Sequence, residues 1–131
     1  MELSSFLIKA KLYGYATGGE GNEIMRVDGG KAFNYQERDF SYSDIYYGFN
    51  PVMGQEIVKK QDDVIWVMNY FGETTCEKKD VTDVYEFLKL ALQNPVPDLP
   101  LRGPEEYIKD NLIYCNSVKG NLNSFVGQEI I

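Results

Sequence analysis

The sequence predicts an α+β protein in which an antiparallel sheet carries two helices on one face. Two observations support this prediction. The tetrapeptide Gly-Gln-Glu-Ile occurs twice, at residues 54–57 and 127–130, and each copy follows an apolar helix candidate and strand-like segments. A length of 131 residues is also typical of one domain with one core. We therefore predict a single domain over residues 1–131, built from two related units.

The spacing of tyrosines and glycines ahead of each tetrapeptide indicates an internal repeat. Three landmarks precede each copy, and the separations between them are the same in both series, while the last loop differs by one residue. Such self-similarity is typical of a duplicated folding unit. We assign the first unit to about residues 4–73 and the second to about residues 81–131. The landmarks are Tyr35, Tyr42 and Gly48 before Gly54, and Tyr107, Tyr114 and Gly120 before Gly127.

The first unit begins with a predicted helix over residues 4–14. Its apolar residues recur at a spacing that places them in one helical stripe. The glycine-rich stretch ATGGEGN at residues 16–22 then predicts a loop. The residues of the stripe are Phe6, Leu7, Ala10 and Tyr13.

Three strands are predicted to follow, over residues 38–47, 54–60 and 63–71. The last of them is apolar on both faces. A strand of that kind usually lies in the middle of a sheet, so we expect a central position for it. One face carries Val64, Trp66, Met68 and Tyr70, and the other carries Ile65, Val67 and Phe71.

The second unit is predicted to begin with a helix over about residues 82–93. Asp83 and Glu86 have the spacing of a capping pair at its start. The stretch GPEEYIKD at residues 103–110 predicts a short helical turn, because proline is favoured at the first position of a helix.

Two further strands are predicted over residues 112–118 and 124–131, and they complete the second unit. No counterpart of the strand at residues 63–71 follows them, so the second unit lacks its last strand. An apolar strand with an open edge is prone to pair with another chain. We therefore expect a homodimer, or another partner, at the edge of the terminal strand.

Composition and charge exclude several classes of function. The net charge is −7 and the basic residues are scattered, which argues against direct binding of nucleic acid. No run of about 18 apolar residues occurs, so we predict no membrane association. The opening residues carry charges within their apolar part, unlike a signal peptide, and this favours a cytoplasmic protein.

The chain contains no histidine and only two cysteines, Cys76 and Cys115. The absence of histidine removes His-based catalytic triads and the common zinc sites. Lone cysteines without an export signal are expected to be reduced. We accordingly predict no catalytic residue, no metal ligand and no cofactor.

The strand at residues 63–71 supplies the first candidate binding residues. Trp66, Met68 and Tyr70 lie on one face of it and can form the floor of an aromatic pocket, with Asn69 on the other face as a hydrogen-bonding group. The alternative is a packed central strand whose asparagine bonds to the backbone. Tyr42 and Tyr114, the equivalent tyrosines of the two units, are further candidates for the aromatic lining.

Charged residues supply the remaining candidates. Glu56 and Glu129 occupy equivalent positions and can face each other across a shared cleft, as a general acid and base or as ligands of a cation. The alternative is that both point to solvent from their strands. Arg102 precedes Gly103-Pro104, where it can hold an anion or only shape the connection.

Five segments together resemble a bacterial family catalogued as domain of unknown function 5680. The resemblance covers nearly the whole chain and implies no activity. It does imply a small protein that either stands alone or is joined to a helix-turn-helix segment, for which this sequence has no room. Members also tend to carry a hairpin beyond the second Gly-x-Glu, which is absent here. The segments are FLIKAK (6–11), WVMNYFG (66–72), FLKLAL (87–92), LRGPEEY (101–107) and FVGQEII (125–131).

Three functions are compatible with these observations. The first is a non-catalytic small-molecule-binding or sensing domain. Its element order parallels that of gyrase-inhibitor-like ligand-binding domains, and its rings and carboxylate suit a small cationic or aromatic ligand. The second is an interaction module that pairs through the open strand edge. The third is a carboxylate-dependent hydrolase that uses Glu56 and Glu129, assisted by Asp39 or Asp44.

Overall fold

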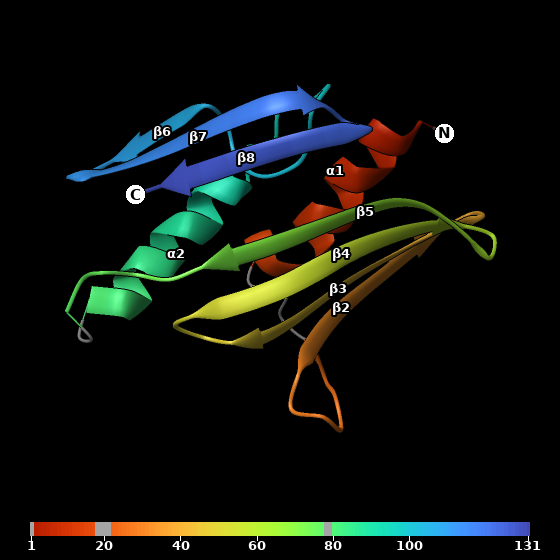
Figure 1. The fold of residues 1–131 in the computed structure, drawn as a ribbon, viewed down its shortest axis with the longest axis horizontal. Helices are drawn as coiled ribbons and strands as arrows, with labels where there is room; N and C mark the ends of the chain where they lie inside the picture. The colour runs from red at the N-terminus through yellow and green to blue at the C-terminus, as the bar shows by residue number, and fades with distance from the viewer. Residues whose placement is uncertain (1, 18–21, 78–79) are drawn as a thin grey trace.

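The computed structural model describes residues 2–17, 22–77 and 80–131, and these ranges hold two α-helices and two antiparallel sheets. The elements are α1 (Leu3–Tyr13), the 3-10 turn η1 (Tyr15–Thr17), β1 (Ile24–Met25), β2 (Lys31–Glu37), β3 (Phe40–Gly48), β4 (Val52–Lys60), β5 (Asp63–Gly72), α2 (Val81–Leu92), β6 (Glu106–Lys109), β7 (Leu112–Asn121) and β8 (Ser124–Ile130). Strands β1 to β5 form one sheet and β6 to β8 the other, each in sequence order. Both helices lie on the same side of the strands (Figure 1). The predicted α+β class is confirmed, with the strands divided between two sheets.

Helix α1 packs the predicted apolar stripe against the larger sheet. Phe6, Leu7 and Ala10 are buried, and the Phe6 ring lies 5.1 Å from the ring of Phe40 and 5.8 Å from that of Tyr35. Complete burial of a phenylalanine side chain contributes about 1.5–3 kcal/mol to stability. This contact fixes α1 over β2 and β3, and thereby fixes the position of its last turn beside the sheets.

Helix α2 packs on the smaller sheet through Phe87 and Ala91, which are buried against Tyr114. The helix begins at Val81 and its N-cap is Asp80, which makes no capping hydrogen bond through its side chain. The predicted Asp83–Glu86 capping pair is therefore wrong. Asp83 lies inside the first turn, where its negative charge interacts favourably with the helix dipole.

Residues 103–110 form an extended segment rather than the predicted helical turn. Strand β6 pairs antiparallel with β7 and places Tyr107 opposite Tyr114. In the first unit β2, which the sequence analysis did not predict, pairs with β3 and places Tyr35 opposite Tyr42. Each unit thus has a helix, a hairpin and a further strand, and the first unit has two additional strands, the short β1 and β5. The predicted loop at residues 16–22 lies mostly outside the described residues.

Strand β5 lies at the edge of the five-stranded sheet, so the predicted central position is wrong. Trp66 and Met68 are buried on one face, while Val67 and Phe71 on the other face are 60% and 70% exposed. The second apolar face lines a cleft instead of packing against another layer, which explains why both faces are apolar.

The two units share the same strand register around the tetrapeptide. Asp44 on β3 lies opposite Glu56 on β4, and Asn116 on β7 lies opposite Glu129 on β8. Gly48 and Gly120, at the ends of β3 and β7, both adopt positive φ, at 81° and 108°. Positive φ is strained for other residues, so both hairpins require glycine at this position. A common origin of the two units by duplication stays a prediction.

Neither described helix is long and apolar enough to cross a membrane. Cys76 and Cys115 are both free and exposed, so neither thiol contributes to the core.

Candidate functional site

A cleft with a volume of about 1280 Å³ lies between the two sheets. Strands β5 and β8 run side by side along it, and α2 passes behind them (Figure 1). At one end Trp66 joins the sheets, because its ring lies 6.0 Å from that of Phe125 and its Nε1 donates to the carbonyl of Leu122 at 3.0 Å. The cleft is therefore closed by an aromatic contact at that end.

A buried ion pair lies beside the cleft, in the core between α1 and β4. Glu56 is only 2% exposed, and its Oε1 accepts hydrogen bonds from Lys11 Nζ and from the Tyr42 hydroxyl, both at 2.6 Å. Lys11 Nζ also donates to the carbonyl of Leu101 at 2.7 Å. Burial is the main cause that raises the Tyr42 pKa, followed by the charge of Glu56, so the hydroxyl keeps its proton and remains a donor. The charge of Glu56 is thus matched within the protein.

The second unit holds its glutamate in a similar way. Glu129 accepts from Arg102 Nε at 2.6 Å and from the Tyr114 hydroxyl at 2.7 Å. Burial by itself would lower the Arg102 pKa, but the charges of Glu129 and Glu56 raise it above its usual value, so Arg102 stays charged. The Arg102 guanidinium also lies 5.1 Å from the centre of the Tyr70 ring. Arg102 therefore connects β8 with β5 across the gap between the sheets.

Asp44 is the carboxyl group of this cluster without a cationic partner among the described residues. It is 6% exposed and accepts a hydrogen bond from the Tyr70 hydroxyl at 2.6 Å. Burial, followed by the nearby charge of Glu56, raises the pKa of Asp44 to about 7. The charges of Lys11 and Arg102 act in the opposite direction and lower this pKa. Among the described residues, Asp44 is thus the one of the three carboxyl groups in the cluster that forms no ion pair.

The structure brings most of the candidate residues together. Met68, Tyr70, Asn69, Arg102 and Glu129 line the cleft. Tyr42 and Tyr114 do not line the cleft. Their hydroxyls donate hydrogen bonds to Glu56 and Glu129, respectively.

Two expectations about the candidate residues are wrong. Trp66 packs in the core at the closed end instead of forming the floor of an aromatic pocket. Glu56 does not point to solvent from its strand, because it is buried in an ion pair. Of the two alternatives for Arg102, the guanidinium is already paired with Glu129 and so is not open to an anion.

Asp44 was predicted only as an assistant in a hydrolase. The alternation of β3 was a usable signal, since Asp44 lies two residues after Tyr42 and therefore shares its buried face. An acidic residue on the buried face of a strand is uncommon unless it is paired. The same rule would have placed Glu56 inside, two residues before the buried Val58.

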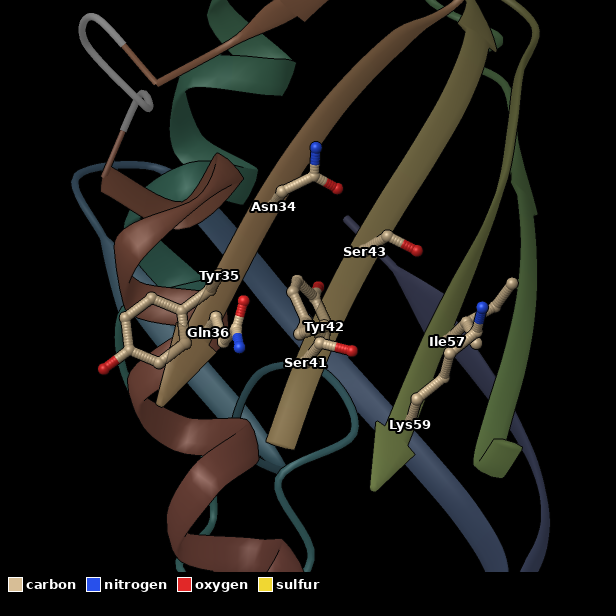
Figure 2. A pocket seen from close by; sticks show the side chains of 8 residues that line it. All are labelled: Asn34, Tyr35, Gln36, Ser41, Tyr42, Ser43, Ile57 and Lys59. Carbon is tan, nitrogen blue, oxygen red and sulfur yellow. The ribbon is translucent and has the colours of Figure 1, made fainter. Parts of the chain in front are cut away.

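A second hollow of about 340 Å³ lies across β2, β3 and β4 (Figure 2). Tyr35 turns its ring toward α1, so the neighbouring Asn34 and Gln36 project from the opposite face of the sheet. Polar, mostly uncharged side chains line this hollow, and of the residues of the charged cluster it includes Tyr42 but none of the three carboxyl groups. The remaining lining residues are Ser41, Tyr42, Ser43, Ile57 and Lys59. We therefore place the candidate site in the larger cleft.

No group of three or more acidic or cysteine side chains in the described part of the chain is arranged to hold a metal ion.

The family model for domain of unknown function 5680 (DUF5680) matches residues 44–131. The chain belongs to this family. The DUF5680 match begins at Asp44 and includes Glu56, Arg102 and Glu129, whereas Lys11 lies outside it. No curated protein and no solved structure matches the chain. The family description assigns no function, and the parallel with gyrase-inhibitor-like domains stays a prediction.

Proposed function

We propose that this protein is a non-catalytic, cytoplasmic domain that binds or senses a small cationic molecule in the cleft between the sheets. The observation that carries the proposal is the buried carboxyl group of Asp44, which lines the cleft and forms no ion pair among the described residues, since Lys11 and Arg102 act on it only as more distant charges. The other two carboxylates of the cluster are already paired. Asp44 is thus the counter-ion that remains for a ligand.

Electrostatics favours a cation over a neutral or anionic ligand. A buried carboxylate without a partner is unfavourable, and an ammonium group beside Asp44 would offset that cost. Aromatic rings surround the same region, since Tyr46 and Tyr70 line the cleft with Asp44. Ring faces attract cations as well, by about 0.5–2 kcal/mol each. The lining therefore suits an amine that carries apolar or aromatic groups.

The ion pairs favour binding over catalysis. A hydrolase that used Glu56 and Glu129 would need at least one of them free to take or give a proton. Both already accept short hydrogen bonds from a cation and from a tyrosine, so neither is free for that role. Glu56 also does not line the cleft.

An interaction module remains a second candidate, because β8 pairs with β7 on one side and has no strand partner on its other side within the described residues. Val126 and Ile130 on this strand are 75% and 60% exposed. An exposed apolar edge strand is a site for pairing with another chain.

A thermal-shift screen of the purified protein against primary, secondary and quaternary amines tests the first candidate. A ligand at about a hundred times its dissociation constant adds about 2.7 kcal/mol to the free energy of unfolding, which raises the Tm by several degrees. We expect Asp44→Asn to abolish the shift. This variant keeps the shape of the side chain and introduces the residue that the second unit has at its equivalent position, Asn116.

The matched control is Asp62→Asn, which makes the same change of charge on an exposed turn. It should retain the full shift. Equal shifts for Asp44→Asn and the wild type would show that Asp44 is not the counter-ion, and the proposal would then fail.

A further inference from the structure

The cleft contains a second polar feature in addition to the charged cluster. Tyr85 on α2 is 9% exposed, and Thr74 follows β5. Tyr85 Oη and Thr74 Oγ1 are both buried, and neither has a hydrogen-bond partner among the described residues. Both residues line the same cleft as Asp44. Buried hydroxyl groups normally have partners, so two unpartnered hydroxyls at one cleft point to a ligand.

The two hydroxyl-bearing residues border the same loop. The Tyr85 ring lies 4.9 Å from that of Phe49, and the backbone N–H of Thr74 donates to Asn50 Oδ1 at 2.8 Å. Phe49 and Asn50 are adjacent in the chain, so Tyr85 and Thr74 lie around one short segment. Phe49 is 57% exposed and also lines the cleft, where its ring is available to an apolar group.

Tyr15 connects this region with the charged cluster. Burial is the main cause that raises the Tyr15 pKa to about 12; the charge of Arg102 lowers it, and smaller contributions from Tyr85, Glu86 and Asp44 raise it. The Tyr15 hydroxyl is therefore within electrostatic reach of both Tyr85 and Asp44. Tyr15 itself lines the cleft. One continuous cavity thus leads from the carboxyl group to the two hydroxyls.

The charges near Tyr85 restrict what its hydroxyl can bind. Burial raises the Tyr85 pKa, and the neighbouring Cys76 and Glu73 raise it further. The hydroxyl keeps its proton and acts as a donor. A negative ligand group would be repelled by Glu73. The matching group is an uncharged acceptor such as a carbonyl oxygen.

We infer that the cleft takes an elongated molecule, with an ammonium group at Asp44 and a flat end bearing an uncharged hydrogen-bond acceptor between Tyr85 and Thr74. The flat end would pack on Phe49. This inference rests on the proposed function and adds the class of ligand to it.

Two matched series of arylalkylamines test the inference. Members of one series carry a 4-acetylphenyl group, members of the other a 4-isopropylphenyl group of similar shape, and both contain alkyl chains of increasing length. Isothermal titration calorimetry measures their affinity for the wild type. At the best chain length we expect the acetyl compound to bind about fivefold tighter, the usual value of one or two hydrogen bonds. Tyr85→Phe should remove this preference while the affinity for the isopropyl compound stays the same.

Tyr47→Phe is the matched control, because it removes a tyrosine hydroxyl that does not line the cleft. It should keep the preference, and Asp44→Asn should weaken both series equally. If amines bind through Asp44 without any acetyl preference, the inference fails and the proposed function stands. If Tyr85→Phe keeps the preference, the inference fails as well. If no amine binds the wild type, both fail.

Discussion

The Tyr70 hydroxyl donates to Asp44 at 2.6 Å and is the hydrogen-bond donor that the described residues provide to this buried carboxyl group. The two other carboxylates of the cluster each have a tyrosine and a cation. Tyr70 lies on β5 and Asp44 on β3, so the pair spans β4 and places the carboxyl group without an ion pair at the wall of the cleft. This asymmetry between otherwise similar units distinguishes Asp44 from Glu56 and Glu129.

Asp44→Asn should stabilise the protein, and the gain should grow with pH. The folded-state pKa of about 7 is above the usual aspartate value, so the folded state binds more protons than the unfolded state between the two values. Wild-type stability therefore falls as pH rises through this interval and levels off above the folded pKa. Asparagine does not ionise, so the variant does not lose stability in this way as pH rises. Urea unfolding from about pH 5 to about pH 8 should show a gain that rises to a few kcal/mol.

Asp62→Asn, on an exposed turn, is the reference for this measurement and should show no such trend. A gain from Asp44→Asn that is independent of pH would contradict the raised pKa.

Tyr85→Phe should stabilise the protein in the absence of any ligand. The buried hydroxyl has no hydrogen-bond partner among the described residues, and an unmet buried hydroxyl costs about 1–3 kcal/mol. Phenylalanine keeps the ring and its contact with Phe49. We expect a gain of about 1 kcal/mol in urea unfolding. Tyr114→Phe, which removes a hydroxyl bonded to Glu129 and Gly103, should lose stability instead. A loss of stability in both variants would contradict the prediction.

Lys11→Met should destabilise the protein strongly. Lys11 and Glu56 have side chains that are only 11% and 3% exposed, and removal of one partner leaves a buried unpaired charge, which costs about 3–5 kcal/mol. Addition of Glu56→Gln to Lys11→Met should recover part of this loss because it removes the unpaired charge. Chemical denaturation of the single and double variants gives the comparison.

The surface pair of Lys9 and Glu37 provides the control for that experiment. Their side chains are 54% and 27% exposed, so Lys9→Met should cost less than about 1 kcal/mol. Equal losses of stability for Lys9→Met and Lys11→Met would show that burial of the Lys11–Glu56 pair does not increase the cost of breaking it.

The sequence predicts the elements with strong periodicity better than the hairpin strands. Helix α1 is predicted within a residue at each end, because its apolar stripe is clear. Strands β2 and β6 were missed, and glycine marks neither of their hairpin turns, although β4 and β5 were predicted across a similar turn at Gln61. Arg38 and Asp110 adopt positive φ in two-residue hairpin turns, yet neither is followed by the glycine that usually marks such a turn. Pairing with β3 and β7 determines these strands more than local sequence does.

The candidate site was predictable only in part, for a similar reason. The register of the repeat indicates that Glu56 and Glu129 are equivalent, and both belong to the charged cluster. Their cationic partners could not be predicted, because Lys11 lies 45 residues from Glu56 and Arg102 lies 27 from Glu129. Such pairs depend on how helix and loops pack against the strands, which a single sequence does not reveal.

If two copies of the protein associate through the open edge of β8, a charged residue on that strand should weaken the association. Val126 is 75% exposed on this strand, and lysine on an edge strand opposes strand pairing because a second copy would bring a like charge close to it. We expect light scattering after size-exclusion chromatography to show a mass that rises with concentration for the wild type and less so for Val126→Lys. Ile108→Lys changes an exposed residue on β6, the opposite edge of the same sheet, and should behave as the wild type does. A constant monomer mass at every concentration would exclude the edge as a self-association site.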